Sequence, residues 1–264
     1  MTAFEHIITV DGATGSGKTT LLRALAMRLG IPAVELGPIV RTVAWLAERE
    51  QIPVVDAVAL VAGLEASGRL RIDRPAAGHL AASEVEVDGR PLRQQVFSGR
   101  LNQAIAAASL DSIVMSWIHS LFRESLRSRR AVVSGREGAS RIFPTAGARI
   151  RLEADSSVRE ARKRHQLTQA GMRPIWLDDV QLLDPPGSEH VVLDTTLLSI
   201  EQVSELALRI IGGQFGWTPA TRYQERIPEH AGLHDQLRSA TIGLTARSPS
   251  ARRDLYASLA PDRT

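Results

Sequence analysis

The chain has 264 residues, of which 44% are hydrophobic and 23% are charged, so it is long enough for one α/β domain with an appendage or for two small domains. It contains no cysteine, which excludes disulfides, thiolate metal sites and a cysteine nucleophile. The formal charge of +3 comes almost wholly from arginine, since Lys18 and Lys163 are the only lysines, and we expect no nucleic-acid partner despite the basic balance.

The sequence carries no sign of a membrane or secretory protein. No apolar run approaches the ~20 residues that span a bilayer, and the N-terminus lacks the basic-then-apolar pattern of a signal peptide. We therefore expect a cytoplasmic protein with no membrane partner.

The first elements surround a glycine-rich loop. The pattern predicts a buried strand over residues 4–10 and an amphipathic helix over residues 17–29. Between them, Gly12-x-x-x-x-Gly17-Lys18-Thr19 has the spacing of a phosphate-binding loop. Glycines let the backbone amides turn toward phosphate oxygens, and the helix N-terminus adds its positive dipole end. We therefore expect ATP here, with Lys18 on the β- and γ-phosphates and Thr19 as the ligand of Mg²⁺.

The nucleotide-binding residues expected from this loop are Gly12, Ala13, Thr14, Gly15, Ser16, Gly17, Lys18, Thr19 and Thr20. Asp11 lies directly before them and is a candidate catalytic residue. Two roles remain open for its carboxylate: general base, or organiser of water bound to Mg²⁺.

The middle of the chain alternates strands and helices around a small insertion. The pattern predicts a short strand at 33–37, a helix from Pro38, and further helix over 54–65. Apolar and polar residues alternate on either side of Asp88-Gly89 within 69–92, which predicts a β-hairpin. Helices at 97–108 and 110–127 and buried strands at 131–135 and 148–152 follow.

The last core elements are a charged helix at 158–169, a strand at 191–194 and a helix ending near 211. The Ser199 to Gln202 spacing before that helix is typical of a capping box. This alternation predicts a doubly wound parallel sheet with the phosphate loop at its carboxyl edge.

These elements predict a P-loop domain over residues 1–211, which includes a β insertion at about 69–95 and a lid at about 170–189. Residues 212–264 form a C-terminal extension rich in arginine, histidine and proline, predicted to be partly helical. Its apolar residues suggest that it packs on the core, on the second subunit of a homodimer, or on the acceptor cleft.

Four segments resemble bacterial cytidylate kinases, a family of nucleoside monophosphate kinases: ITVDGATGSGKTTL, VEVDGRPL, ARIRLEADSSVREARKRHQL and VVLDTTLLSIEQVSELAL. The resemblance covers roughly residues 4–211. It implies a P-loop kinase fold with a β-hairpin insertion, ATP and Mg²⁺ as cofactors, and a small-molecule acceptor. It also implies that Lys18, Arg136 and Arg162 stabilise the transferring phosphoryl group.

The acceptor side departs from that family's pattern. The family segment D-[ST]-G-A-x-Y-R corresponds here to ELGPIVR at 35–41, and D-G-R-D corresponds to SGRE at 134–137. Arginines expected near 96–98 and 113–115 are absent unless Arg100 replaces the first, and residues 171–189 hold only Arg173. The predicted acceptor-binding residues are Glu35, Gly37, Arg41, Arg100 and Glu137.

The missing arginines bear on the acceptor. A monophosphate acceptor needs convergent cations, because two anionic groups must approach each other, whereas a hydroxyl needs a carboxylate such as Asp11, Glu35 or Glu137 as its base. Our leading hypothesis from sequence is therefore an ATP-dependent kinase that phosphorylates a hydroxyl of a small metabolite or nucleoside. A CMP or dCMP kinase that takes arginines from the hairpin is the alternative. A nucleotide-binding regulatory protein without turnover is a third reading.

Overall fold

The computed structural model describes residues 4–72, 85–96, 101–135, 138–169 and 190–215. At its centre lies a five-stranded sheet in the order β2-β6-β1-β7-β8, with every neighbouring pair parallel. The strands are β1 (Ile7–Gly12), β2 (Ala33–Glu35), β6 (Ala131–Ser134), β7 (Ala148–Glu153) and β8 (Val191–Asp194). Because all the strands are parallel, their carboxyl ends meet at one edge of the sheet, where ligands bind in open α/β folds.

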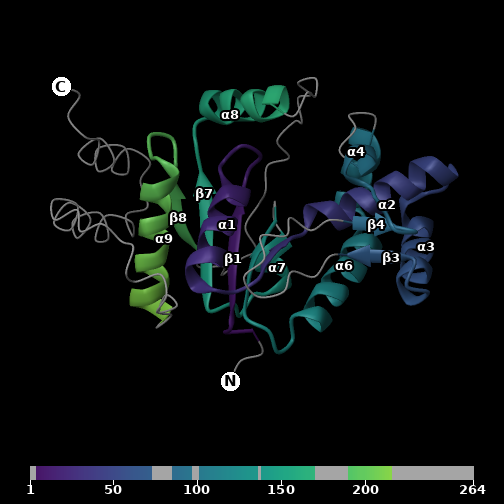
Figure 1. Cartoon of the computed structure of the whole chain (residues 1–264), viewed down its shortest axis with the longest axis horizontal. Coiled ribbons are helices and arrows are strands. Elements are labelled where there is room, and N and C mark those ends of the chain that lie inside the picture. Colours follow the sequence, from purple (N-terminus) through teal and green to yellow (C-terminus); the bar gives the residue numbers. More distant parts are fainter. Residues whose placement is uncertain (1–3, 73–84, 97–100, 136–137, 170–189, 216–264) are drawn as a thin grey trace.

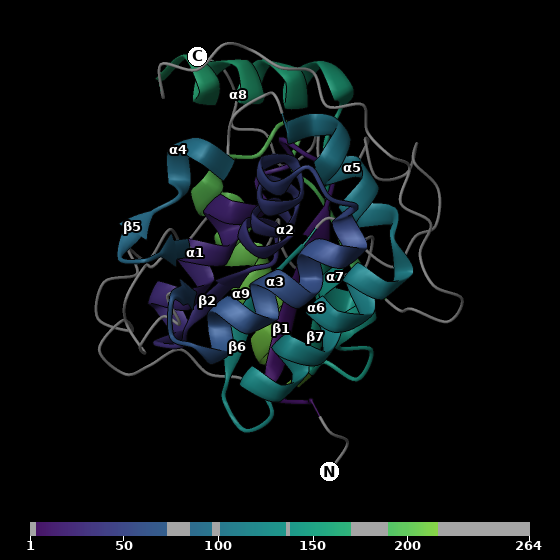
Figure 2. The same cartoon turned by 90° about the vertical axis from the view of Figure 1, so that its right-hand side faces the viewer.

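Helices cover both faces of this sheet (Figures 1 and 2). Helices α1 (Lys18–Leu29) and α9 (Ile200–Phe215) pack together on one face. The other face is covered by α2 (Gly37–Glu50), α3 (Val54–Ala66), α6 (Ser112–Ser125) and the short α7 (Gly138–Ile142), and α5 (Asn102–Leu110) packs against α2. Helix α8 (Ser156–Gln169) crosses the carboxyl edge of the sheet at the top of both views.

Among the described residues, two large apolar clusters pack on the sheet, one on each face, and a third, small cluster lies between α2 and α5. Along β1, Ile7 belongs to the cluster under α2, α3 and α6, whereas Ile8 and Val10 belong to the cluster under α1 and α9. This alternation is what a strand buried on both sides requires. The predicted doubly wound α/β fold is confirmed.

The predicted hairpin is also present. Strands β3 (Leu70–Ile72), β4 (Val85–Val87) and β5 (Arg90–Pro91) form a separate antiparallel sheet. Asp88 and Gly89, which join β4 to β5, have φ angles of 53° and 73°, as a two-residue hairpin turn requires. A four-residue helix, α4 (Arg93–Val96), follows it.

Several predicted boundaries are wrong. The first strand begins at Ile7, because the ring of Phe4 instead packs edge-on against Phe143 with 5.0 Å between centroids. The second helix of the predicted pair begins at Ser112, because the Asp111 side chain accepts hydrogen bonds from two amides of its first turn at 2.9 Å. Helix α7 was not predicted.

Parts of the predicted insertion, lid and extension lie outside the described residues, namely 73–84, 97–100, 170–189 and 216–264. Among the residues that are described, no single helix is both long and apolar enough to cross a membrane. Helices α5 and α6 meet that test only as a pair, with a 77° bend between them.

Candidate active site

The loop between β1 and α1 has the backbone of a phosphate cradle. Gly12, Gly15 and Gly17 all have positive φ angles, of 143°, 82° and 98°. A Cβ atom on Gly12 would lie 2.3 Å from the backbone oxygen of Leu152, and one on Gly15 would lie 2.5 Å from that of Arg159. Only glycine therefore fits these two positions. Gly17 is the N-cap of α1 and has no side chain to occupy the first amides of the helix, which suits them to bind an anion.

Lys18 and Thr19 begin α1 at the carboxyl edge of the sheet. The Nζ atom of Lys18 donates to the backbone oxygen of Ala13 at 2.6 Å. The Oγ1 atom of Thr19 donates to Oε1 of Glu35 at 2.5 Å, and Glu35 is the last residue of β2. Sequence alone placed Glu35 on the acceptor side, but the structure brings its carboxylate to the residue predicted to bind the metal.

The oxygens of Thr19 and Glu35 are the ligand type that Mg²⁺ prefers, either directly or through water. The described residues contain no cluster of three or more acidic or histidine side chains that could hold a metal alone. In kinases, nucleotide phosphates supply most of the ligands of Mg²⁺.

Two arginines of α8 are tied to the phosphate loop. Arg162 donates from Nη1 to Oγ1 of Thr195 at 3.0 Å and from Nη2 to the backbone oxygen of Thr195 at 2.6 Å. The Thr195 hydroxyl in turn lies 3.0 Å from the backbone oxygen of Ser16. Arg159 donates to the backbone oxygen of Thr14 at 3.3 Å. Helix α8 is therefore held over the loop by a direct contact with Thr14 and by an indirect one, through Thr195, with Ser16.

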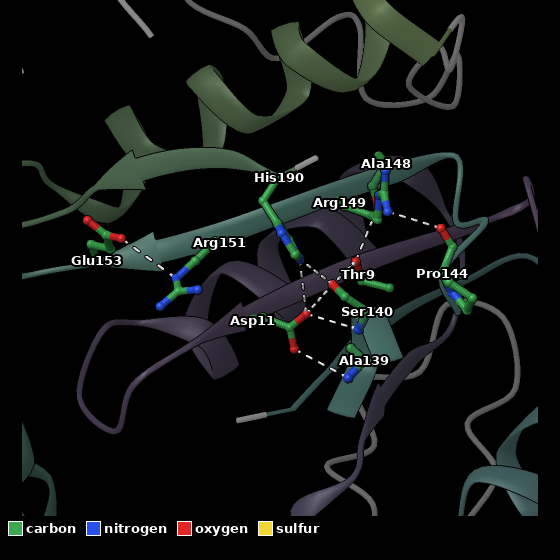
Figure 3. Close-up of polar contacts among 10 residues, drawn as sticks. All are labelled: Thr9, Asp11, Ala139, Ser140, Pro144, Ala148, Arg149, Arg151, Glu153 and His190. Carbon is green, nitrogen blue, oxygen red and sulfur yellow. Dashed lines mark hydrogen bonds and ion pairs between the residues drawn. The ribbon is translucent and has the colours of Figure 1, made fainter. Parts of the chain in front are cut away.

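Asp11 points away from the loop and toward α7 (Figure 3). Its Oδ1 atom accepts from the amide of Ala139 at 3.3 Å, and its Oδ2 atom accepts from the amide of Ser140 at 3.0 Å and from the Ser140 hydroxyl. Burial raises the pKa of Asp11 to about 6, while the hydrogen bonds from Ser140 and Ala139 and the charge of Lys18 act in the opposite direction. These contacts favour a role in holding α7 over a role as general base.

Comparison of the chain with known proteins shows which family it is similar to. The family model described as cytidylate kinase matches residues 8–183. A cytidylate kinase of Salmonella choleraesuis is 31% identical over 79% of this chain and 96% of its own length. Cytidylate kinases of Oleidesulfovibrio alaskensis and Aquifex aeolicus are 27% and 26% identical, over 75% and 77% of this chain and 95% of their own lengths.

The chain belongs to the cytidylate kinase family. It is accordingly an ATP-dependent kinase, and the reading as a regulatory protein without turnover is not retained. The resemblance stated from the sequence is confirmed.

The acceptor residues that the family resemblance suggested are only partly described. Gly37 begins α2, and Arg41 on the same helix donates from Nη1 to the backbone oxygen of Val96 at 3.2 Å. Arg100 and Glu137 lie outside the described residues, as does Arg136, which was predicted to be catalytic. The structure therefore links one predicted acceptor residue, Arg41, to the end of α4 beyond the hairpin.

Sequence reasoning missed two residues at this site, Thr195 and Arg159. Thr195 is the first residue after β8, at the same sheet edge as the loop, and is only 3% exposed. Arg159 lies about one helical turn before Arg162 on α8. Their positions, at a strand end and on a shared helix face, were the signals that could have identified them.

Proposed function

We propose that the chain transfers the γ-phosphoryl group of ATP to a cytidine nucleotide, CMP or dCMP. The observation that carries this proposal is the similarity to cytidylate kinases over 75–79% of this chain and 95–96% of theirs. Sequence reasoning left two acceptor classes open, a hydroxyl and a cytidine monophosphate. The comparison favours the monophosphate, because all three relatives are named cytidylate kinases.

On the donor side, we assign the triphosphate to the loop amides and to Lys18. Lys18 Nζ now lies on the backbone oxygen of Ala13, and a phosphate oxygen would replace that weaker, neutral acceptor. Mg²⁺, when bound, would offset charge on the β- and γ-phosphates, and Thr19 and Glu35 are the residues proposed to hold it. The remaining loop residues, Ala13 to Gly17 and Thr20, surround the phosphates.

Arg162 is proposed to stabilise the charge of the transferring phosphoryl group, together with Arg136. A guanidinium has five N–H donors, so the two hydrogen bonds to Thr195 still allow contact with a phosphoryl oxygen. The same bonds hold the guanidinium in place before the nucleotide binds, which reduces the ordering cost on binding. The acceptor residues proposed are Gly37, Arg41, Arg100 and Glu137.

A second candidate is transfer to a hydroxyl of a small metabolite or nucleoside. It is supported by the apolar residues that stand where the family resemblance leads us to expect polar or charged acceptor-binding residues. Leu36 is 4% exposed and part of the apolar core, so it supplies no hydroxyl where the family resemblance places serine or threonine. The positions on α6 where an arginine was expected are Ile113, Val114 and Met115. Fewer cations favour an acceptor that carries less negative charge.

A panel of acceptors with labelled ATP tests the proposal. We expect CMP and dCMP to be converted to diphosphates more efficiently than the other nucleoside monophosphates, cytidine or simple alcohols. Lys18→Ala, which removes the phosphate-binding cation, is the blank for contaminating kinases. Efficient phosphorylation of an alcohol or nucleoside without conversion of CMP would replace the first candidate by the second.

A further inference from the structure

Below α7, a group of polar side chains interrupts the apolar core. Asp11, Ser140 and His190 come from β1, α7 and the residue directly before β8, and they meet on one face of the sheet (Figure 3). Only 8% of the Asp11 side chain and 4% of the His190 side chain are exposed. Ser140 is 5% exposed, and the Thr9 hydroxyl lies 3.2 Å from its Oγ atom. Buried polar groups at this depth are costly unless they are hydrogen-bonded.

The geometry fixes the direction of the hydrogen bonds. An ionised Asp11 has only acceptors, so the Ser140 hydroxyl donates its single proton to Oδ2 of Asp11. Nε2 of His190 lies 2.7 Å from the same Ser140 oxygen and must then be the donor. Nε2 of His190 is 4.0 Å from Oδ2 of Asp11, too far for a direct hydrogen bond. His190 therefore acts on Asp11 through Ser140.

These three residues join the elements that hold the phosphate loop. Asp11 precedes Gly12, where the loop begins. His190 precedes β8, and the residue after β8 is Thr195, which holds both Arg162 and the backbone oxygen of Ser16. The two strands thus contact the loop at their carboxyl ends and are linked to each other across β7 by the side chains of His190, Ser140 and Asp11.

The charged groups around Asp11 are mostly cationic. Lys18 on α1 interacts electrostatically with the carboxylate. On β7, Arg151 is paired in register with Asp11 and contacts Glu153 at 3.6 Å, and Arg149 donates to a backbone oxygen at 3.0 Å. Helix α7 carries Arg141, which is exposed. The hydrogen bonds that hold the carboxylate come from Ser140 and the Ala139 amide, so α7 orients Asp11 while Lys18 is the cation that acts on its charge.

We propose that Ser140 and His190 are positioning residues for the phosphate loop, joined to Asp11 in a hydrogen-bonded relay whose direction depends on a single proton. With Asp11 ionised, the relay runs from His190 through Ser140 to Asp11, and both carboxylate oxygens hold the amides of α7. When a proton is added to Asp11, Asp11 donates to Ser140, the ring proton of His190 moves from Nε2 to Nδ1, and Ser140 donates to the Nε2 atom that has lost its proton. The added proton leaves Asp11 with one fewer lone pair for α7 and removes the negative charge that attracts Lys18.

Nucleotide binding by the full chain tests this without any assumption about the acceptor. We would titrate the protein with Mg²⁺ and the non-hydrolysable analogue AMP-PNP between about pH 5 and 8, and compare the pH midpoint of the affinity among variants. Ser140→Ala and His190→Ala each remove a donor that stabilises ionised Asp11, so each should move the midpoint upward by roughly half a pH unit or more. Ser140→Thr and His190→Gln keep a donor and should return it toward the wild-type value.

The double variant separates a relay from a direct electrostatic effect. If His190 acts through Ser140, His190→Ala should add no further shift in a Ser140→Ala background. A shift of the same size in both backgrounds, or midpoints that do not move in either single variant, would overturn the proposal. His165→Gln, an exposed histidine on α8, is the matched control and should keep the wild-type midpoint.

Nitrogen NMR of the histidine rings gives a readout that a purely structural role would not change. At a pH well above the midpoint, Nε2 of His190 should carry hydrogen, and its resonance should follow the titration of Asp11 in the wild type but not in Ser140→Ala. An Nε2 atom without hydrogen at that pH would contradict the direction of the relay.

Discussion

The Thr19 hydroxyl donates to the carboxylate of Glu35 at 2.5 Å, and this contact joins the first turn of α1 to the end of β2. In the sheet, β6 lies between β2 and β1, so the two residues meet only because both strands end at the same edge. The contact gives Glu35 a role on the donor side of the reaction, beside the residue expected to ligate Mg²⁺.

We predict that Glu35→Gln weakens Mg²⁺ binding in the presence of nucleotide by about tenfold to a hundredfold, the usual cost of losing a group that supports a metal site. The amide can still accept the hydrogen bond from Thr19 but carries no charge for the metal. Mn²⁺ binding followed by electron paramagnetic resonance, with AMP-PNP present, measures the effect apart from turnover.

Glu48 is an exposed residue of α2. The control variant Glu48→Gln removes the same charge away from the metal site and should bind Mn²⁺ as the wild type does. If Glu35→Gln and Glu48→Gln bind equally well while Glu35→Gln raises the KM for CMP, Glu35 belongs to the acceptor site, as sequence reasoning suggested.

The loop glycines offer a paired prediction about backbone shape. Gly12→Ala places a Cβ atom 2.3 Å from the backbone oxygen of Leu152 at a φ of 143°. It should lower the unfolding free energy by about 1–3 kcal/mol from backbone strain alone and abolish nucleotide binding. At Gly63 in α3, a Cβ atom would meet no other described element within 4 Å, and Gly63→Ala should raise the unfolding free energy by about 0.5–1 kcal/mol. Urea unfolding of both variants tests the contrast, and equal effects would contradict it.

Local features of the fold could be predicted from sequence because neighbouring residues determine them. The turn at Asp88 and Gly89 is present with both φ angles positive. The capping box is present as well, with the Ser199 amide donating to the Gln202 side chain at 2.9 Å and the Gln202 amide donating back to Ser199. In each case the residues that decide the geometry lie within three positions of each other.

Contacts across the sheet could not be predicted in the same way. The link from Thr19 to Glu35 depends on strand order, which no local pattern encodes. Helix α7 has only five residues, too few to show a repeating helical pattern, and it is held by the carboxylate of Asp11, which is more than 120 residues away. The orientation of Asp11 toward Ser140 therefore could not be inferred from its place before the loop.

The tie between α8 and the loop predicts a specific loss in transfer. Arg162→Ala removes the proposed phosphoryl contact, and we expect kcat to fall by about a hundredfold or more, as when a transition-state donor is lost. Thr195→Val removes only the hydroxyl between Arg162 and Ser16, so kcat should fall less, by about tenfold, with a smaller change in the KM for ATP. Single-turnover measurements separate these effects from product release.

Arg164→Ala, on an exposed position of the same helix, is the control for loss of charge on α8. If Arg162→Ala and Arg164→Ala lose activity equally while Thr195→Val keeps it, the effect belongs to the general charge of α8, and the specific contact of Arg162 with Thr195 is not responsible.

The raised pKa of Asp11 predicts how stability depends on pH. Its pKa is about 6 in the folded chain, where burial is the main cause, against an ordinary value of 3.8. Between these values the folded state holds a proton that the unfolded state has released, so the stabilising contribution is complete below about pH 4 and is lost as the pH rises through 6.

The variant Asp11→Asn does not titrate at this position and therefore serves as the reference. The unfolding free energy of the wild type minus that of the variant should fall on the order of 2–3 kcal/mol from pH 4 to 7. Urea unfolding at several pH values measures this difference, and Asp56→Asn reports the same chemical change at an exposed position of α3. Parallel curves for the wild type and Asp11→Asn would mean that the carboxylate is ionised throughout this range, so that the proton needed to reverse the relay would not enter at Asp11.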